Sequence, residues 1–221
     1  MFQPNFQVAE YPTSGYWYEP RYYGYPVNLN RGPLIANHLA AISRTLTNAL
    51  SDTPRAYAVR FDLRLPTEFD VTDSEVITRF FNAFRRLLEA ADQEKTKEGK
   101  RVHPHRLRYC WAREWGSEGR PHYHVLIILN HDRYRTLGAF KNTDGNLSSR
   151  IKTAWAIATG QNYTSVDRLI HFPNNAEYRL IRLSEDYQQQ LQNLFYRVSY
   201  FAKAESKVFG IKQRTFGTSM G

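Results

Sequence analysis

The sequence contains a single cysteine, Cys110, so it cannot form an internal disulfide bond. A chain of this kind suits a reducing compartment, and we therefore predict a cytoplasmic protein. Its first residues have neither a basic start nor an apolar stretch, so no signal peptide is expected. The longest strongly apolar run, Val125–Leu129, is far shorter than the roughly 20 residues of a membrane span. We expect no membrane partner.

Acidic residues are outnumbered by basic ones, 21 to 30, which leaves a formal net charge of +9. Such an excess predicts a polyanionic partner, and nucleic acid is the expected one once membranes are set aside. A hydrophobic fraction of 42% and a charged fraction of 23% exclude fibrous and fully disordered chains. No internal repeat or linker divides the 221 residues, so we predict one α+β domain.

The chain divides by composition into a Tyr/Pro-rich N-terminal arm (residues 1–32), a domain (33–210) and a C-terminal tail (211–221). Six tyrosines lie among prolines and glycines between Tyr11 and Pro26. Their rings either stack on the bases of single-stranded nucleic acid or pin the arm to the domain. We favour the second interpretation.

Apolar periodicity predicts the main elements of the domain. Helices are expected at 34–50, 76–91 and 184–207, and in part of 134–159; strands are expected at 57–65, 105–115, 121–130, 163–166 and 178–183. The strand at 57–65 alternates apolar and polar residues, so we expect it to be half-buried. The polar run 92–100 is expected to be a solvated connection.

Two histidines, His122 and His124, alternate at the start of the expected strand 121–130. Period two places both imidazoles on one face, about 6–7 Å apart, where they can share a divalent ion. Glu114 precedes a Gly-rich turn that folds it back beside the histidines in a β-hairpin. Two histidines and one carboxylate leave open positions on a metal, as a catalytic site requires. We predict a metal site at these three residues, with Glu118 and Asp62 as alternative third ligands.

A histidine pair of this kind is a weak signal by itself, because such pairs also arise by chance. The chain holds a second pair, His103 and His105, on either side of a proline that follows a polar run. We interpret the second pair as part of a loop without a metal.

In the expected C-terminal helix, Tyr196, Tyr200, Lys203 and Lys207 fall on one stripe about 60° wide. The apolar residues of that helix occupy the opposite side, so the core does not need these tyrosines. A tyrosine that attacks a phosphodiester forms a phosphotyrosine, and a nearby lysine can neutralise the developing charge. We therefore predict that Tyr196 and Tyr200 are nucleophiles assisted by Lys203, with Tyr187 as the next candidate.

The run Gly-Arg-Pro-His-Tyr-His-Val-Leu at 119–126, followed by Tyr196-x-x-x-Tyr200-x-x-Lys203, resembles the HUH endonucleases. It is most similar to the two-tyrosine rolling-circle replication initiators of gene-A type phages. The short form without a helicase resembles the inovirus-type replication proteins and the YagK/YfjJ C-terminal domain family. The histidines precede the tyrosines, as in replication initiators and unlike conjugative relaxases. The resemblance covers roughly residues 55–207, and its first motif, at Val59–Leu65, is a loose match.

This resemblance implies a fold, an HUH nuclease or RRM-like antiparallel sheet of about five strands flanked by helices. It implies that His122, His124 and Glu114 hold Mg²⁺ or Mn²⁺ and that the two tyrosines cut DNA. The implied activity nicks one strand at a single-stranded or hairpin origin through a covalent 5′-phosphotyrosine and later rejoins it. No Gly-x-x-x-x-Gly-Lys-Ser/Thr loop occurs, so a host helicase and a polymerase are expected partners.

Two other functions fit parts of the pattern. One is a transposase or other mobile-element nickase with the same chemistry, and the other is a non-catalytic DNA-binding or regulatory protein on the same fold. Every version requires contacts to DNA phosphates, which make binding sensitive to salt. We expect such contacts from the basic residues beside the two motifs, namely Arg113, Arg120, Arg197 and Lys207.

Overall fold

A computed structural model describes residues 14–116, 119–140, 145–205 and 214–219. Its centre is an antiparallel six-stranded sheet in the order β10-β6-β7-β5-β8, in which β9 also pairs with β5. The strands are β5 (Arg55–Arg64), β6 (Arg108–Trp115), β7 (Pro121–Asn130), β8 (Ile170–His171), β9 (Glu177–Ile181) and β10 (Phe216–Thr218). The prediction of an α+β fold around an antiparallel sheet is confirmed, with six strands where about five were expected.

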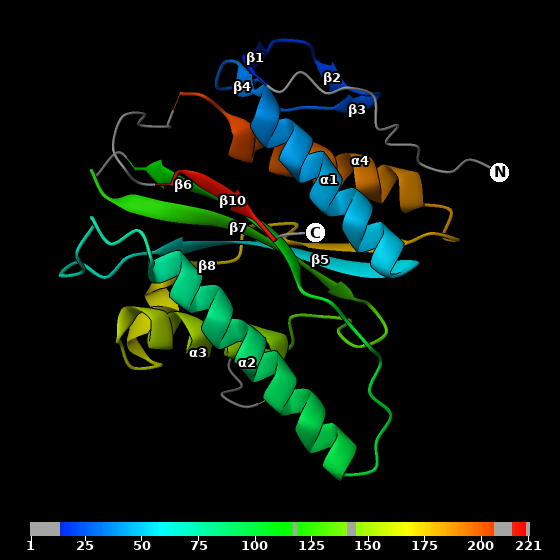
Figure 1. Cartoon of the computed structure of the whole chain (residues 1–221), viewed down its shortest axis with the longest axis vertical. Helices are drawn as coiled ribbons and strands as arrows, with labels where there is room; N and C mark the ends of the chain where they lie inside the picture. Colours follow the sequence, from blue (N-terminus) through cyan, green and yellow to red (C-terminus); the bar gives the residue numbers. More distant parts are fainter. Residues whose placement is uncertain (1–13, 117–118, 141–144, 206–213, 220–221) are drawn as a thin grey trace.

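Helices cover both faces of this sheet (Figure 1). One face carries α1 (Ala36–Asp52) and α4 (Tyr187–Ser199), and the other carries α2 (Val76–Lys97) and α3 (Leu147–Thr159). The apolar positions of α1 recur at helical spacing, and their side chains are buried against the sheet and α4. Two separate cores result, one on each side of the sheet.

The strand β5 is buried on both faces, which corrects the prediction of a half-buried strand. Its odd-numbered residues pack into the core under α2 and α3. Its even-numbered residues begin with Ala56 and Ala58, which pack under α1 and α4, and continue with Arg60 and Asp62. The polar side chains, from which we predicted a solvent-exposed face, therefore lie on the face that α1 and α4 cover.

Three predicted elements differ from the observed ones. Helix α2 continues through 92–97, the start of the expected connection, and ends with Lys95 and Lys97, whose charges suit a helix C-terminus. The expected strand 163–166 is wrong: these residues form a turn and the start of a 3₁₀ helix, η1 (Ser165–Leu169), and the nearby strand is β8.

The C-terminal helix is also shorter than predicted. Helix α4 ends at Ser199, and η2 (Tyr200–Ala202) is a single 3₁₀ turn. Lys203 then has extended backbone and forms a β-bridge with Leu34. The predicted continuous α-helix therefore ends at Ser199, before Tyr200 and Lys203.

The described part of the N-terminal arm lies over α1 and α4 (Figure 1). Its strand β1 (Tyr16–Trp17) pairs with β4 (Leu34–Ile35) at the start of the domain, and β2 (Arg21–Tyr22) pairs with β3 (Tyr25–Pro26). The ring of Tyr22 is fully buried and stacks on Phe195 of α4 with centroids 6.0 Å apart. Some rings of the arm thus attach it to the domain. Within the described ranges, no helix is both long and apolar enough to cross a membrane.

Candidate metal centre and tyrosine site

A β-hairpin brings the predicted metal residues together. Strands β6 and β7 pair in the register that sets Glu114 directly opposite His122. The connecting turn is closed by the Gly116 N–H, which donates to the carbonyl oxygen of Arg120 at 2.9 Å. Because alternate residues of a strand share a face, His124 lies on the same side of the sheet as His122.

The three side chains converge at atomic distances. His124 Nε2 lies 3.3 Å from His122 Nε2 and 3.0 Å from Glu114 Oε2. One potential ligand atom from each residue falls within 4.8 Å of the others. Glu114 and His124 are buried, and His122 is half-buried at the open side. This group can hold a divalent metal ion, with two nitrogen ligands and one oxygen ligand.

Asp62, which the sequence offers as an alternative third ligand, contacts the other ring nitrogen of His124. It faces His124 across the β5–β7 pair, and its Oδ1 lies 2.5 Å from His124 Nδ1. With a metal ion on Nε2, the proton of His124 would lie on Nδ1, where the Asp62 carboxylate accepts it. Arg60 donates to Asp62 at 2.9 Å. Asp62 thus orients His124 from behind. The other alternative, Glu118, lies outside the described residues.

The surroundings shift the pKa values of these groups in opposite directions. Burial, followed by the charge of His124, lowers the pKa of His122 to about 4. Burial also acts to lower the pKa of His124, but its hydrogen bonds with Asp62 and Glu114 outweigh burial and raise it. Burial acts to raise the pKa of Asp62, yet the contacts with His124 and Arg60 lower it overall. His122 is therefore neutral at pH 7, as a metal ligand must be.

Tyr200 and Lys203 lie beside this group. The Lys203 ammonium donates to the hydroxyl of Tyr200 and pairs with Glu114 Oε2 at 2.7 Å. The ring of Tyr200 meets that of His124 edge to face with centroids 5.8 Å apart, and the ring of Phe201 stacks on that of His124 with centroids 5.9 Å apart. The 3₁₀ turn η2 thus delivers a tyrosine hydroxyl and a lysine to the metal residues.

Tyr196 lies one helical turn earlier on α4, and 39% of its surface is exposed. Its side chain makes no hydrogen bond or ring contact with the residues that the structure describes, the metal group included. The two tyrosines are therefore not equivalent. One is held by a lysine at the metal group, and the other is open to solvent.

The four predicted DNA-binding residues differ in position. Arg113 is buried on the α2/α3 side and donates to the carbonyl of Val71, so it is not brought to the metal group. Arg120 donates to the carbonyl of Pro66 at 2.5 Å. Arg197 donates to the carbonyl of Asn174 at 3.0 Å, on the same face as Arg60. Lys207 lies outside the described residues.

A cavity of about 440 Å³ opens beside His122 and Asp62. It is lined by three arginines, of which the sequence analysis named Arg120 and missed Arg64 and Arg168. Arg64 lies two residues after Asp62 on β5, so the alternation of the strand puts both on one face. This alternation in the sequence could have identified Arg64. Arg168 comes from η1, and no sequence pattern connected it to the histidines.

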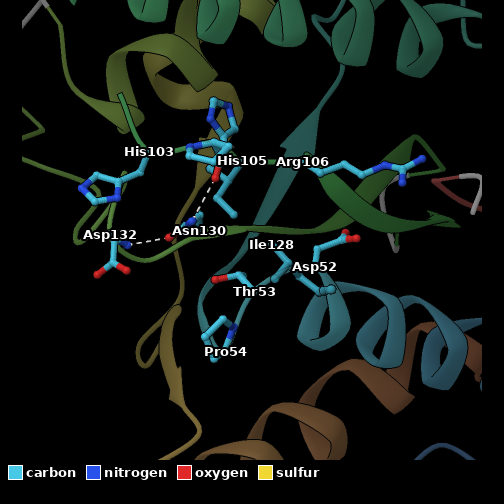
Figure 2. A pocket seen from close by; sticks show the side chains of 12 residues that line it. Asp52, Thr53, Pro54, His103, His105, Arg106, Ile128, Asn130 and Asp132 are labelled. Atoms are coloured by element: carbon cyan, nitrogen blue, oxygen red, sulfur yellow. Dashed lines mark hydrogen bonds between the residues drawn. The ribbon is translucent and has the colours of Figure 1, made fainter. Parts of the chain in front are cut away.

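The second histidine pair lies elsewhere. Figure 2 shows His103 and His105 in a loop that lines another cavity, of about 490 Å³, together with Asp52 and Asn130. Asn130 is at the far end of β7, about 20 Å from His124 at 3.4 Å per residue. His105 pairs with the carboxylate of Asp92 at 3.3 Å. Among the described residues, this pair is not part of a group of three or more ligand-type side chains. The interpretation as a loop agrees with this placement.

A carboxylate, two histidines and a tyrosine–lysine pair thus lie together at one end of the sheet, in a group that could hold a metal ion. The chain belongs to the YagK/YfjJ C-terminal domain family, whose model matches residues 22–219. The uncharacterized protein YagK of Escherichia coli (strain K12) is 36% identical over 197 residues, which cover 85% of this chain and 94% of YagK. The uncharacterized protein YfjJ of the same organism is 30% identical over 191 residues, covering 81% and 92%. No solved structure matches the chain significantly.

Proposed function

We propose that this protein is an HUH-type endonuclease that nicks and rejoins single-stranded DNA through a covalent 5′-phosphotyrosine. The observation that carries the proposal is the contact chain from the metal group to a tyrosine. Glu114 joins His124 on one side and Lys203 on the other, and Lys203 donates to the Tyr200 hydroxyl. Buried carboxylate, imidazole and ammonium groups beside a phenol are unnecessary for the core, but phosphodiester cleavage uses each of them.

The donor set fits a divalent cation. His122 Nε2, His124 Nε2 and one oxygen of Glu114 would hold it, while Asp62 keeps the His124 ring oriented. When bound, such an ion polarises the oxygens of the scissile phosphate and positions it for attack. Mg²⁺ and Mn²⁺ are the proposed ions, and two imidazoles make Mn²⁺ the better choice for a first assay.

In the proposed reaction the Tyr200 hydroxyl loses its proton, and its oxygen forms a bond to phosphorus. The bond between phosphorus and the 3′ oxygen breaks, and the departing oxygen takes up a proton to become a free 3′ hydroxyl. Lys203, already hydrogen-bonded to Tyr200, stabilises the negative charge on the phenolate. The phosphotyrosine retains the bond energy, so attack by a 3′ hydroxyl reverses the step and rejoins the strand.

Tyr196 is the proposed second nucleophile, since its exposed hydroxyl is open to a second strand while Tyr200 holds the first. This division suits the initiation of rolling-circle replication of a phage, prophage or plasmid element at a single-stranded or hairpin origin. The new 3′ hydroxyl would prime a host polymerase, and a host helicase would separate the strands. The net charge of +9 supports an interaction with DNA.

The test is covalent attachment to DNA. We would incubate the protein with labelled single-stranded oligonucleotides, including a hairpin library, with Mn²⁺ or with EDTA, and analyse adducts on denaturing gels. A metal-dependent adduct is expected, strongly reduced in Tyr200→Phe, less reduced in Tyr196→Phe and absent in the double variant. Sequencing the attached ends would give the cleavage site.

The second histidine pair provides a matched control, because His103→Ala removes an imidazole that lies far from the site. His122→Ala should abolish the adduct and His103→Ala should leave it. An adduct in the double tyrosine variant would refute the nucleophile assignment and direct attention to Tyr187. Salt-sensitive binding without any adduct would favour a non-catalytic DNA-binding protein. Strand transfer into a second DNA molecule by a dimer would favour a transposase.

A further inference from the structure

Three consecutive aromatic residues of the N-terminal arm, 16–18, differ in how far their rings are exposed. Trp17 turns inward, with its ring centroid 5.0 Å from the buried Tyr22. Tyr16, in β1, and Tyr18, which follows that strand, are 52% and 66% exposed. The ring that attaches the arm and the two rings that face solvent therefore belong to one short segment. Attachment explains Trp17 but gives no reason for two neighbouring exposed tyrosines.

This segment lies next to the tyrosine site. Trp17 pairs with Leu34 in the β1–β4 ribbon, and Leu34 in turn forms the β-bridge with Lys203. The Ala204 N–H also donates to the carbonyl of Pro33 at 3.0 Å. Two strand spacings of about 4.8 Å put the arm backbone about 10 Å from that of Lys203. A stacked single strand covers that distance in about three nucleotides at about 3.4 Å each.

A surface hollow of about 650 Å³ joins the two places. Tyr16, Tyr18 and Arg31 line it on the arm side, and Ala204 and Glu205 line it on the side of Lys203. Arg31 is exposed and makes no ion pair with any residue in the described ranges. Glu205 is the one acidic side chain among the lining residues, and its charge opposes a nucleic acid there.

We propose that Tyr16 and Tyr18, with Arg31, form a base-stacking platform for the single-stranded DNA that occupies the tyrosine site. The inference rests on the proposed function for the identity of the ligand. Stacking on aromatic rings tolerates every base, so the platform holds the strand without reading its sequence. Arg31 contributes a phosphate contact beside the rings. Bases stacked there extend the grip on the strand beyond the metal group.

The test separates stacking from phosphate contacts. Fluorescence anisotropy in EDTA would measure the binding of oligothymidylate and of an abasic strand of the same length, which keeps the phosphates and lacks the bases. The dissociation constant of the abasic strand divided by that of oligothymidylate reports the contribution of the bases to binding. Tyr16→Ala/Tyr18→Ala should lower this ratio by about tenfold or more, because each stacked base is lost. Arg31→Gln should instead reduce the salt dependence by about one phosphate contact.

Three further variants serve as controls for this measurement. Tyr16→Phe/Tyr18→Phe keeps both rings and should keep the ratio. Tyr18→Ala alone should lower it in part, and it leaves the β1–β4 pairing of Tyr16 with Ile35 intact. Leu183→Ala removes a 97% exposed side chain at the other end of α4 and should change nothing.

The outcomes distinguish the two proposals. An unchanged ratio in the double alanine variant, with tight binding to oligothymidylate, would overturn the platform and leave the nickase untouched. A lowered ratio without any covalent adduct would support the platform while overturning the nickase. The absence of all binding to single-stranded DNA would overturn both.

Discussion

The two faces of the central sheet differ in what they carry, although the same strands form both. Under α2 and α3 the side chains of β5 and β7 are apolar along most of their length, namely Tyr57, Val59, Phe61, Leu63, Tyr123, Val125, Ile127 and Leu129. Under α1 and α4 the apolar part stops halfway, after Ala56, Ala58, Leu126 and Ile128. Towards the histidines, that face continues with Arg60, Asp62, Arg64, His122 and His124.

The comparison shows how a small domain holds a buried polar site without losing its core. Because successive residues of a strand point to opposite faces, His122 and His124 can be polar while Tyr123 and Val125 remain apolar. One face then supplies continuous hydrophobic burial, and the other divides its length between packing and chemistry. Variants on the two faces should therefore have separable effects.

The largest effect on stability is expected on the continuous face. Phe61→Ala removes a fully buried ring that contacts Phe80, with ring centroids 6.1 Å apart. Such a deletion costs about 3–5 kcal/mol of unfolding free energy, measured from urea denaturation. A loss below about 1 kcal/mol would mean that this face is not the main source of stability.

His122, the proposed metal ligand on the divided face, should show the reverse pattern. His122→Ala is expected to weaken Mn²⁺ binding by more than about 100-fold, with little change in the stability of the metal-free protein. The measurement is the shift in melting temperature with added Mn²⁺, which follows from the binding of metal to the folded state. His103→Ala is the matched control and should keep the full shift. Equal Mn²⁺ shifts in the two variants would contradict the metal site.

The carboxylate behind His124 should have a smaller effect. Asp62→Asn keeps the size of the side chain but weakens the hold on the His124 Nδ1–H, so Mn²⁺ affinity should fall by about 10–100-fold. Asp52→Asn is the control, since Asp52 also pairs with an arginine, Arg108, at 2.7 Å but lies at the other end of the sheet. A loss of affinity equal to that of His122→Ala would make Asp62 a direct ligand.

The smallest effect is a pH dependence within the core of the continuous face. Burial raises the pKa of Tyr134 to about 12 from an ordinary value of 10.0. Above pH 10 the unfolded chain ionises this tyrosine while the folded protein does not, so stability is lost as pH rises from 10 towards 12. Tyr134→Phe should leave stability at pH 7 within about 1 kcal/mol of wild type and flatten this alkaline decline. Urea midpoints at pH 7 and pH 11 would check both statements.

Tyr18→Phe serves as the control for that measurement, since Tyr18 is exposed in the folded protein. It should leave the alkaline decline as steep as in the wild type. An equal flattening in both variants would show that burial of Tyr134 is not the cause.

Local patterns predicted the hairpin and its contents well. The limits of β7 agree with the predicted strand, and the register of β6 against β7 follows from a short turn. Glu114, His122 and His124 converge because period two and hairpin pairing are local rules. The burial of Arg113 on the α2/α3 side was not foreseen, because a count of basic residues does not say which face of a strand each one occupies.

The sequence by itself determined the α+β class, the paired histidines with their carboxylate, and the tyrosine–lysine motif, because each depends on spacing within one element or one turn. The tertiary structure decided which tyrosine meets the metal group. The bridge between Lys203 and Leu34 accompanies the change from α4 to a 3₁₀ turn, which sets Tyr200 at the site and leaves Tyr196 in solvent. It also placed Asp62 behind His124 and the arm beside Lys203. These arrangements join segments far apart in the chain, and their energy comes from packing that no local period encodes.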